Sequence, residues 1–225
     1  QAECISVTRE KKTVSPPKLF DLTSLQREAN RIYGYTAKQT LDLAQALYEK
    51  RLLTYPRTDS AFLTDDMGGT ATNIAALLCG KLPFMQDVSF TPDVSRTLDS
   101  KKVSDHHAII PTVNVADAEF GELPSGEQKV LSLITARLLS ALGDPAVRNE
   151  VDVEFTCADT VFRAKAKNIR EKGWRDIQEW IMGGSAESTD SENNRKEISE
   201  NADMLACIAT LTNGKSYPLQ NPKME

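Results

Sequence analysis

The chain has 225 residues, of which 40% are hydrophobic and 26% charged, as is ordinary for a globular protein with a sizeable core. No run reaches the roughly 18 apolar residues of a membrane-spanning helix, and the first residues lack the apolar core of a secretion signal. The formal net charge is −5, yet residues 27–57 hold six basic and three acidic residues, a local net charge of +3. Overall acidity therefore does not exclude a nucleic-acid partner, because binding depends on where the charges lie.

Helical periodicity and capping residues predict four helices in the first two thirds of the chain. Their predicted ranges are 24–34, 36–50, 64–80 and 125–143. The predicted N-terminal caps are Thr23-Ser24, Thr36 and Thr64, and the predicted C-terminal stops are Gly34 and Gly143. The last of these helices is predicted to be strongly amphipathic. Between the helices, Pro56 favours a strand or extended segment over residues 51–55, and residues 81–103 predict a loop.

Alternating apolar and polar residues predict strands on both sides of the helices. The predicted strands are 4–14, 149–157, 160–169 and 202–214. The first is expected to end in a charged turn before Pro16-Pro17, and Ala158-Asp159 predicts a hairpin turn. The polar residues 183–197 predict a mobile loop. The fold class is therefore α+β, with a helical domain at 34–143 inserted in a β-rich domain formed by 1–33 and 144–225.

Neither the cysteines nor the acidic residues predict a metal site. No two of the cysteines are close enough for a Cys-x-x-Cys pair, which indicates reduced, mostly buried thiols in a cytoplasmic protein. They are Cys4, Cys79, Cys157 and Cys207. Glu150, Asp152 and Glu154 share one face of a predicted strand and could gather Mg²⁺. The polar face of a half-buried strand explains the same alternation more simply.

The segment LLTYPRTDS, residues 52–60, places a tyrosine two positions before an arginine. A phenol titrates near 10, so tyrosine becomes a useful nucleophile where a cation stabilises the phenolate or the attacked phosphate. In an extended chain Tyr55 and Arg57 share a face, and Arg57 can bind two phosphate oxygens. A polar turn that could fix this geometry follows: Thr58, Asp59 and Ser60. On spacing alone, a half-buried tyrosine beside a solvated arginine is the commoner explanation.

The segment SDHHAIIPT, residues 104–112, contains the two histidines of the chain, His106 and His107. Histidine can donate a hydrogen bond to a phosphate and titrates near neutral pH. A surface turn ahead of a buried Ala-Ile-Ile run is the competing interpretation, and the segment alone favours it. Adjacent histidines also suggest a metal, but no third ligand lies nearby in the sequence, so no metal site is predicted.

These two segments, in this order and about fifty residues apart, resemble the two signatures around the active site of type IA DNA topoisomerases. Residues 16–60 closely resemble the topoisomerase III branch. The detailed match covers roughly residues 15–115. The later part is similar in pattern through the fourth predicted helix, Gly173-Trp174 and the final LTNG.

The resemblance implies that Tyr55 attacks a phosphodiester of single-stranded DNA and forms a 5′-phosphotyrosine link. It implies that Arg57 stabilises the attacked phosphate and that His106 contacts it. Further DNA contacts are expected at Thr58, Asp59, Ser60, His107, Lys50 and Arg51. Another DNA strand would pass through the gap, and the break would be resealed without ATP.

The resemblance also implies partners outside this chain. A Toprim domain of the same polypeptide would bind Mg²⁺, and no cofactor or metal is expected in the chain itself. The chain is expected to be a central piece of a bacterial, cytoplasmic, nucleoid-associated enzyme that works as a monomer and binds no membrane. In family terms, the helical domain carries the tyrosine, and the β-rich domain is part of an arch that acts as a hinge.

Two other classes of protein are alternatives to this enzyme assignment. The chain by itself could be a non-catalytic DNA-binding or gate module, since its charge is −5 and the metal-binding domain is not among these residues. A tyrosine recombinase also forms phosphotyrosine, but it needs an arginine and a His-x-x-Arg box before the tyrosine. Here the histidines follow the tyrosine and no such box exists, which argues against that class.

Overall fold

A computed structural model describes residues 1–82, 85, 90–183 and 210–218. It divides the chain into two compact units. The sheet unit comprises residues 1–14 and 146–172 with a C-terminal part, and the helical unit comprises residues 15–145 with a segment that starts at Gly173. The combination of helices and a sheet confirms the α+β class. The helical unit begins at residue 15 rather than 34, because the first helix packs with the other helices.

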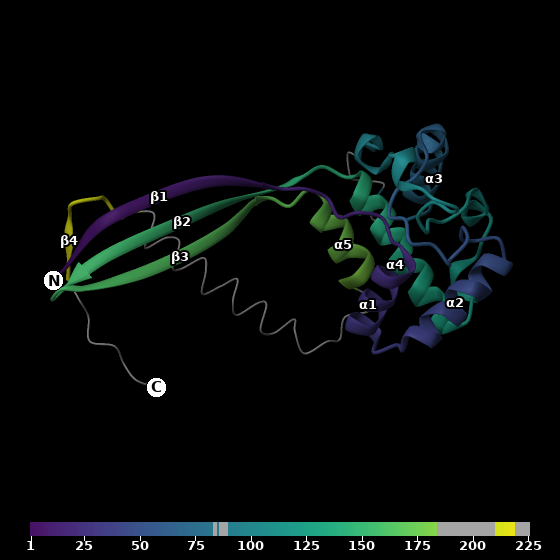
Figure 1. The fold of residues 1–225 in the computed structure, drawn as a ribbon, viewed down its shortest axis with the longest axis horizontal. Helices are drawn as coiled ribbons and strands as arrows, with labels where there is room; N and C mark the ends of the chain where they lie inside the picture. Colours follow the sequence, from purple (N-terminus) through teal and green to yellow (C-terminus); the bar gives the residue numbers. More distant parts are fainter. Residues whose placement is uncertain (83–84, 86–89, 184–209, 219–225) are drawn as a thin grey trace. The chain divides into compact units, whose positions relative to one another are not determined.

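The sheet unit is an antiparallel sheet in the order β3-β2-β1-β4 (Figure 1). Its strands are β1 (Ala2–Val14), β2 (Ala146–Cys157), β3 (Thr160–Glu171) and β4 (Ser216–Tyr217). The charged turn expected at the end of the first strand was wrong, because β1 pairs with β2 as far as Val14. The hairpin turn is confirmed, with φ values of 48° at Ala158 and 61° at Asp159.

In the C-terminal part of the sheet unit, the structure corrects the position of the last predicted strand. The predicted mobile loop at 183–197 lies almost entirely outside the described residues, as does the first part of the strand predicted at 202–214. Within the described part, residues 210–214 contain a turn, and the strand follows them at Ser216–Tyr217. Gly214 has a φ of 77° and donates its N–H to the carbonyl of Cys4 at 2.7 Å, so this turn hydrogen-bonds to β1.

The polar face of β2 is neutralised by basic side chains. Glu150 pairs with Lys12 and with Arg148, the latter at 2.8 Å. Two further cross-strand pairs join Asp152 to Lys165 at 3.0 Å and Glu154 to Arg163 at 2.7 Å. The hydrogen bond from Lys12 is the main reason that the pKa of Glu150 lies below its usual range. These carboxylates therefore do not fit a magnesium site, and the interpretation of a polar strand face is confirmed.

Among the residues that the structure describes, the helical unit contains five α-helices (Figure 1). They are α1 (Leu22–Tyr33), α2 (Ala37–Glu49), α3 (Gly68–Lys81), α4 (Ser125–Leu142) and α5 (Trp174–Gly183). The cap of α1 is Asp21 rather than Thr23-Ser24, because Ser24 stands at the third helical position and completes the capping box. The cap at Thr36 and the stop at Gly34, with a φ of 70°, are confirmed. No helix in the described ranges is long and apolar enough to cross a bilayer.

Helix α4 is the central element of the helical unit. It contacts the other four helices, and twelve of its eighteen residues are buried, so the prediction of a strongly amphipathic helix was wrong. Two further differences concern the start of α3 and the existence of α5. Thr64 makes no capping hydrogen bond: a short 3₁₀ turn (Asp65–Met67) follows it, and α3 begins at Gly68. Helix α5, which packs on α4 through the buried Ile177, was not predicted.

Candidate active site

The segments 52–60 and 104–112 lie side by side in the helical unit. Leu53 and Pro111 form an isolated antiparallel bridge. The backbone hydrogen bonds on either side of it run from the N–H of Thr54 to the carbonyl of Ile110 and from the N–H of Thr112 to the carbonyl of Leu52, both at 3.0 Å. Antiparallel pairing makes the two chains run in opposite directions. The residues after Thr54 therefore lie beside the residues before Ile110.

Hydrogen bonds from hydroxyl side chains further stabilise the pairing of the two segments. Thr58 is buried, and its hydroxyl donates to the carbonyl of His106 at 2.7 Å and accepts from the N–H of Ser60 at 3.1 Å. The hydroxyl of Ser60, also buried, donates to the carbonyl of Lys102 at 2.8 Å. Thr54 donates to the carbonyl of Ala108 at 3.2 Å. Thr58 and Ser60 were expected to contact DNA, but their hydroxyls bind backbone carbonyls of the second segment and of Lys102 just before it.

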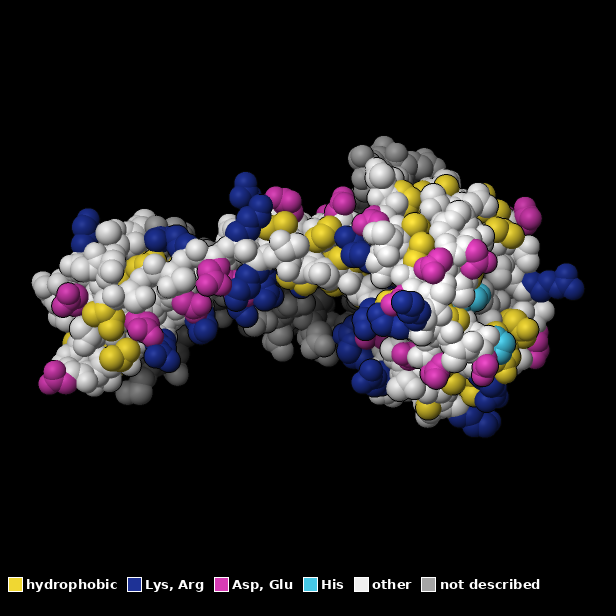
Figure 2. Space-filling view, turned by 45° about the horizontal axis from the view of Figure 1, so that its top comes forward, with side chains coloured by type: hydrophobic (Ala, Val, Ile, Leu, Met, Phe, Trp, Pro, Cys, Tyr) yellow, Lys and Arg dark blue, Asp and Glu magenta, His cyan; other side chains and the backbone are white. Residues whose placement is uncertain are grey.

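This pairing brings the side chains of Tyr55 and His106 into contact. Their ring centroids are 4.3 Å apart, with the planes tilted by 44°. The ring of Tyr48, from α2, meets Tyr55 in an edge-to-face arrangement with centroids 5.5 Å apart. Tyr55 is half-buried and His106 is exposed, whereas His107 is half-buried, with its Nδ1 2.8 Å from the carbonyl of Ala108. Histidine side chains reach the surface of the helical unit in Figure 2.

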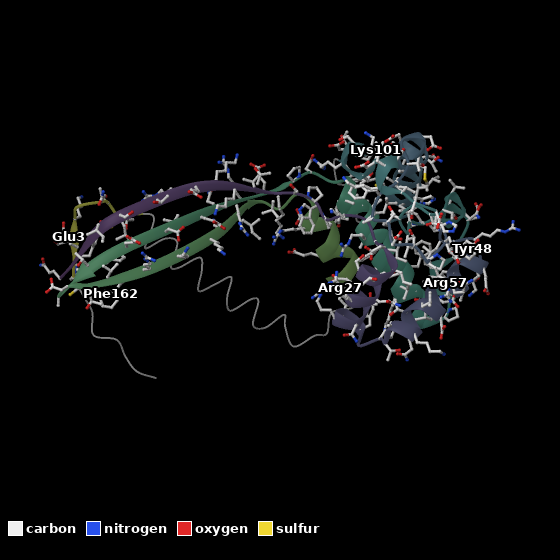
Figure 3. All side chains as sticks on the ribbon, viewed as in Figure 1. Glu3, Arg27, Tyr48, Arg57, Lys101 and Phe162 are labelled. Atoms are coloured by element: carbon white, nitrogen blue, oxygen red, sulfur yellow. The ribbon has the colours of Figure 1, made fainter. Side chains whose placement is uncertain are left out.

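The basic residues between Arg27 and Arg57 differ in their partners and in their distance from this site. Arg31 and Lys38 form ion pairs on the helix surface, whereas Arg27, Arg51 and Arg57 are exposed and pair with no acidic residue in the described part of the chain. Figure 3 shows Arg57 on the same side of the helical unit as Tyr48, and Arg27 well away from both. The guanidinium of Arg57, two residues after Tyr55, is therefore available for an anionic ligand.

The remaining expected DNA contacts differ in their surroundings. Asp59 is exposed and accepts a hydrogen bond from the hydroxyl of Ser104 at 3.3 Å. Lys50 pairs with Glu127, whose side chain is only 8% exposed. Its ammonium is therefore engaged in an ion pair with α4 and is not free to bind DNA. Arg51 is exposed and has a φ of 60°, in the left-handed region.

We expect Lys50→Ala to lower the free energy of unfolding of the 225-residue chain by about 2 kcal/mol, because Glu127 would keep a nearly buried charge without its partner. The matched control is Lys38→Ala at the opposite end of α2, whose pair with Asp42 is solvated, with side chains 87% and 62% exposed. That change should cost about 0.5 kcal/mol or less. Denaturant unfolding followed by tryptophan fluorescence measures both, and equal losses would contradict a structural role for Lys50.

A hollow of about 460 Å³ lies beside Tyr48, whose ring touches Tyr55, and nothing in the sequence predicts it. It is lined by Tyr48, Glu49, Arg51, Leu53, Thr54, Thr112 and Asn114. In the sequence, Tyr48 is recognisable only as one of the apolar positions of the predicted helix 36–50. Its neighbourhood depends on the turn at Arg51, which cannot be foreseen from spacing because non-glycine residues seldom adopt a positive φ.

Comparison with known proteins adds the family. The model of the family described as DNA topoisomerase matches residues 1–221. DNA topoisomerase 3 of Bacillus cereus is 36% identical over 183 residues, covering 79% of this chain and 25% of that protein. DNA topoisomerase 3 of Bacillus subtilis is 30% identical over 230 residues, covering 97% and 30%. Full-length topoisomerase I from Thermotoga maritima has the same fold, with a TM-score of 0.60 at 20% identity over 99% of this chain and 32% of that one. The chain thus spans about a quarter to a third of the length of these proteins.

Proposed function

The chain belongs to the type IA DNA topoisomerase family, and we propose that it is the part of a longer enzyme that breaks and rejoins one DNA strand through Tyr55. The observation that carries this proposal is the contact between Tyr55 and His106, with ring centroids 4.3 Å apart, formed by the two paired segments. The exposed Arg57 adds a cation two residues from the phenol. The substrate that this assignment implies is single-stranded DNA.

The proposed step exchanges one phosphate ester bond for another. The phenol of Tyr55 loses its proton, and its oxygen forms a bond to phosphorus while the bond between phosphorus and the 3′ oxygen breaks. The 3′ oxygen takes up a proton and leaves as a hydroxyl, and the phosphate on the 5′ end of the other piece stays on the tyrosine. Attack by the same 3′ hydroxyl reverses the step. Because the bond energy is retained in the phosphotyrosine ester, resealing needs no ATP.

Arg57 and His106 stabilise the charge on the phosphate during this exchange. The guanidinium of Arg57 can donate to two phosphate oxygens, and an N–H of His106 can donate to one. Such donors contribute most where charge increases in the transition state. Arg51, Asp59 and His107 lie on the same paired segments or next to them, and we propose that they contact the DNA on either side of the attacked phosphate.

The metal-binding part of the enzyme is assigned outside these residues, and the hinge is assigned to the sheet unit. We propose that Mg²⁺ is bound by a Toprim domain of the same polypeptide, since no group of three potential ligands occurs among the residues described here and the carboxylates of β2 are paired with cations. The sheet unit would form part of the arch that acts as a hinge while a second strand passes. The enzyme would act as a monomer in the bacterial cytoplasm, on nucleoid DNA.

The proposal is tested with the full-length enzyme, Mg²⁺ and a single-stranded oligonucleotide labelled at one end, quenched with detergent. A 5′-phosphotyrosine link keeps the 3′ label on the protein and releases the 5′ label with the free 3′ hydroxyl. Retention of the 5′ label, or no protease-sensitive adduct at all, would refute the proposed chemistry. The 225-residue chain alone should form no adduct. An adduct formed by it would show that it is a complete active site rather than a gate module.

A further inference from the structure

The hollow beside Tyr55 is not used by the phosphate exchange. It is formed by the end of α2, by the two paired segments and by the adjoining residues Arg51 and Asn114, all within the helical unit. Leu53 and Thr54 line it and directly precede Tyr55, and Tyr48 lines it while touching the ring of Tyr55. A strand whose phosphate lies against Tyr55 can therefore place a neighbouring nucleotide in this hollow.

The lining suits a flat, polar ligand. Tyr48 is 39% exposed, so part of a large aromatic ring is open to a second ring. Glu49 and Asn114 are exposed and offer acceptor oxygens. The carboxylate of Glu49 disfavours a phosphate inside the hollow. Arg51 supplies a cation at its wall that, within the described ranges, has no acidic partner.

The backbone at Arg51 is held in place by the second segment. Its φ of 60° is disfavoured for a residue with a side chain. The carbonyl of Arg51 accepts hydrogen bonds from the hydroxyl of Thr112 and from Nδ2 of Asn114, the latter at 3.0 Å. Backbone outliers that the surrounding structure maintains in this way cluster at ligand sites.

We propose that the hollow receives one base of the cleaved DNA strand, stacked on Tyr48, while Arg51 contacts the backbone phosphate of that nucleotide. Stacking on an aromatic side chain is the usual way in which proteins bind unpaired bases. The base site rests on the proposed function, and it makes Tyr48 a positioning residue that fixes which phosphate lies against Tyr55.

The test uses full-length enzyme carrying Tyr55→Phe, which cannot cleave, and single-stranded oligonucleotides with one abasic residue at successive positions. Fluorescence anisotropy should find one position near the site of cleavage where loss of the base weakens binding about 5- to 100-fold. Adding Tyr48→Leu should weaken binding of intact DNA by a similar factor and remove the penalty of the abasic residue. Tyr48→Phe, which keeps the ring, should retain the penalty.

If the abasic residue weakens binding at no position while Tyr48 is present, the base site is wrong. Because the protein is unaltered at the hollow in this experiment, a damaged site could not explain that result. An abasic penalty that is unchanged in Tyr48→Leu would overturn the base site equally. The adduct assay on the enzyme with Tyr55 intact runs in parallel. Adducts together with no abasic penalty at any position leave the proposed function standing and remove only the base site, whereas absence of adducts removes the function.

Discussion

Tyr55→Phe in the full-length enzyme is expected to reduce the covalent DNA adduct by about 10³-fold or more, because removal of a nucleophile leaves no group for the phosphorus to bond to. Phenylalanine keeps the ring that packs against His106 and Tyr48, so the two paired segments should keep their geometry. Affinity for single-stranded DNA should therefore change by less than about twofold, which corresponds to about 0.4 kcal/mol of binding free energy. Gel analysis of detergent-quenched reactions measures the adduct, and anisotropy measures the affinity.

The matched control is Tyr35→Phe, the same change outside the site. The ring of Tyr35 packs on Tyr33, with centroids 5.4 Å apart, at the start of α2 rather than at its end. Adduct formation should be retained in this variant. Adducts that persist in Tyr55→Phe, or that disappear equally in both variants, would sink the assignment of Tyr55.

Gly173→Ala should lower the free energy of unfolding of the helical unit by about 3–4 kcal/mol. Gly173 has a φ of 52°, and a Cβ there would lie 2.6 Å from the carbonyl oxygens of Asp144 and Pro145. Both are backbone atoms, so they cannot rotate away, and α5 would have to move off α4. The left-handed conformation accounts for about 1–2 kcal/mol, and the displaced helix accounts for the rest.

Gly34→Ala separates these two contributions. Gly34 has a φ of 70°, but a Cβ there meets nothing within 4 Å. Its loss should be only the cost of the left-handed conformation, about 1–2 kcal/mol. Denaturant unfolding of the 225-residue chain, followed by the fluorescence of the two tryptophans of α5, compares the variants. Equal losses would show that the close approach at Gly173 has no energetic consequence.

The sequence predicted the elements best where a local signal decides the structure. Thr36 and Gly34 were identified as a cap and a stop from residue chemistry that acts within one helical turn. The hairpin at Ala158-Asp159 followed from two alternating runs. Prediction failed where the packing of neighbouring elements determines which residues are buried. Helix α4 is apolar on most sides because four helices surround it, and the periodicity of a single helix does not show how many neighbours it has.

At the candidate site, the sequence identified the two segments but not what each side chain does. Thr58, Ser60 and Lys50 look like DNA contacts in the sequence, because hydroxyls and ammonium groups suit phosphates. The structure engages all three within the protein. Their partners are carbonyls 42 and 48 residues away and a carboxylate 77 residues away, which local patterns do not reveal.

Peptide mapping of the trapped adduct shows directly whether Tyr55 itself bonds to the DNA. Trypsin cleaves after Lys50, Arg51 and Arg57, so the peptide 52–57 contains Tyr55 alone, and the neighbouring Tyr48 lies in the peptide 39–50. Digestion of the protein and of the DNA, followed by mass spectrometry, should find a nucleotide 5′-phosphate on the peptide 52–57. A nucleotide found on the peptide 39–50, or on any other peptide of the enzyme, would show that Tyr55 is not the nucleophile.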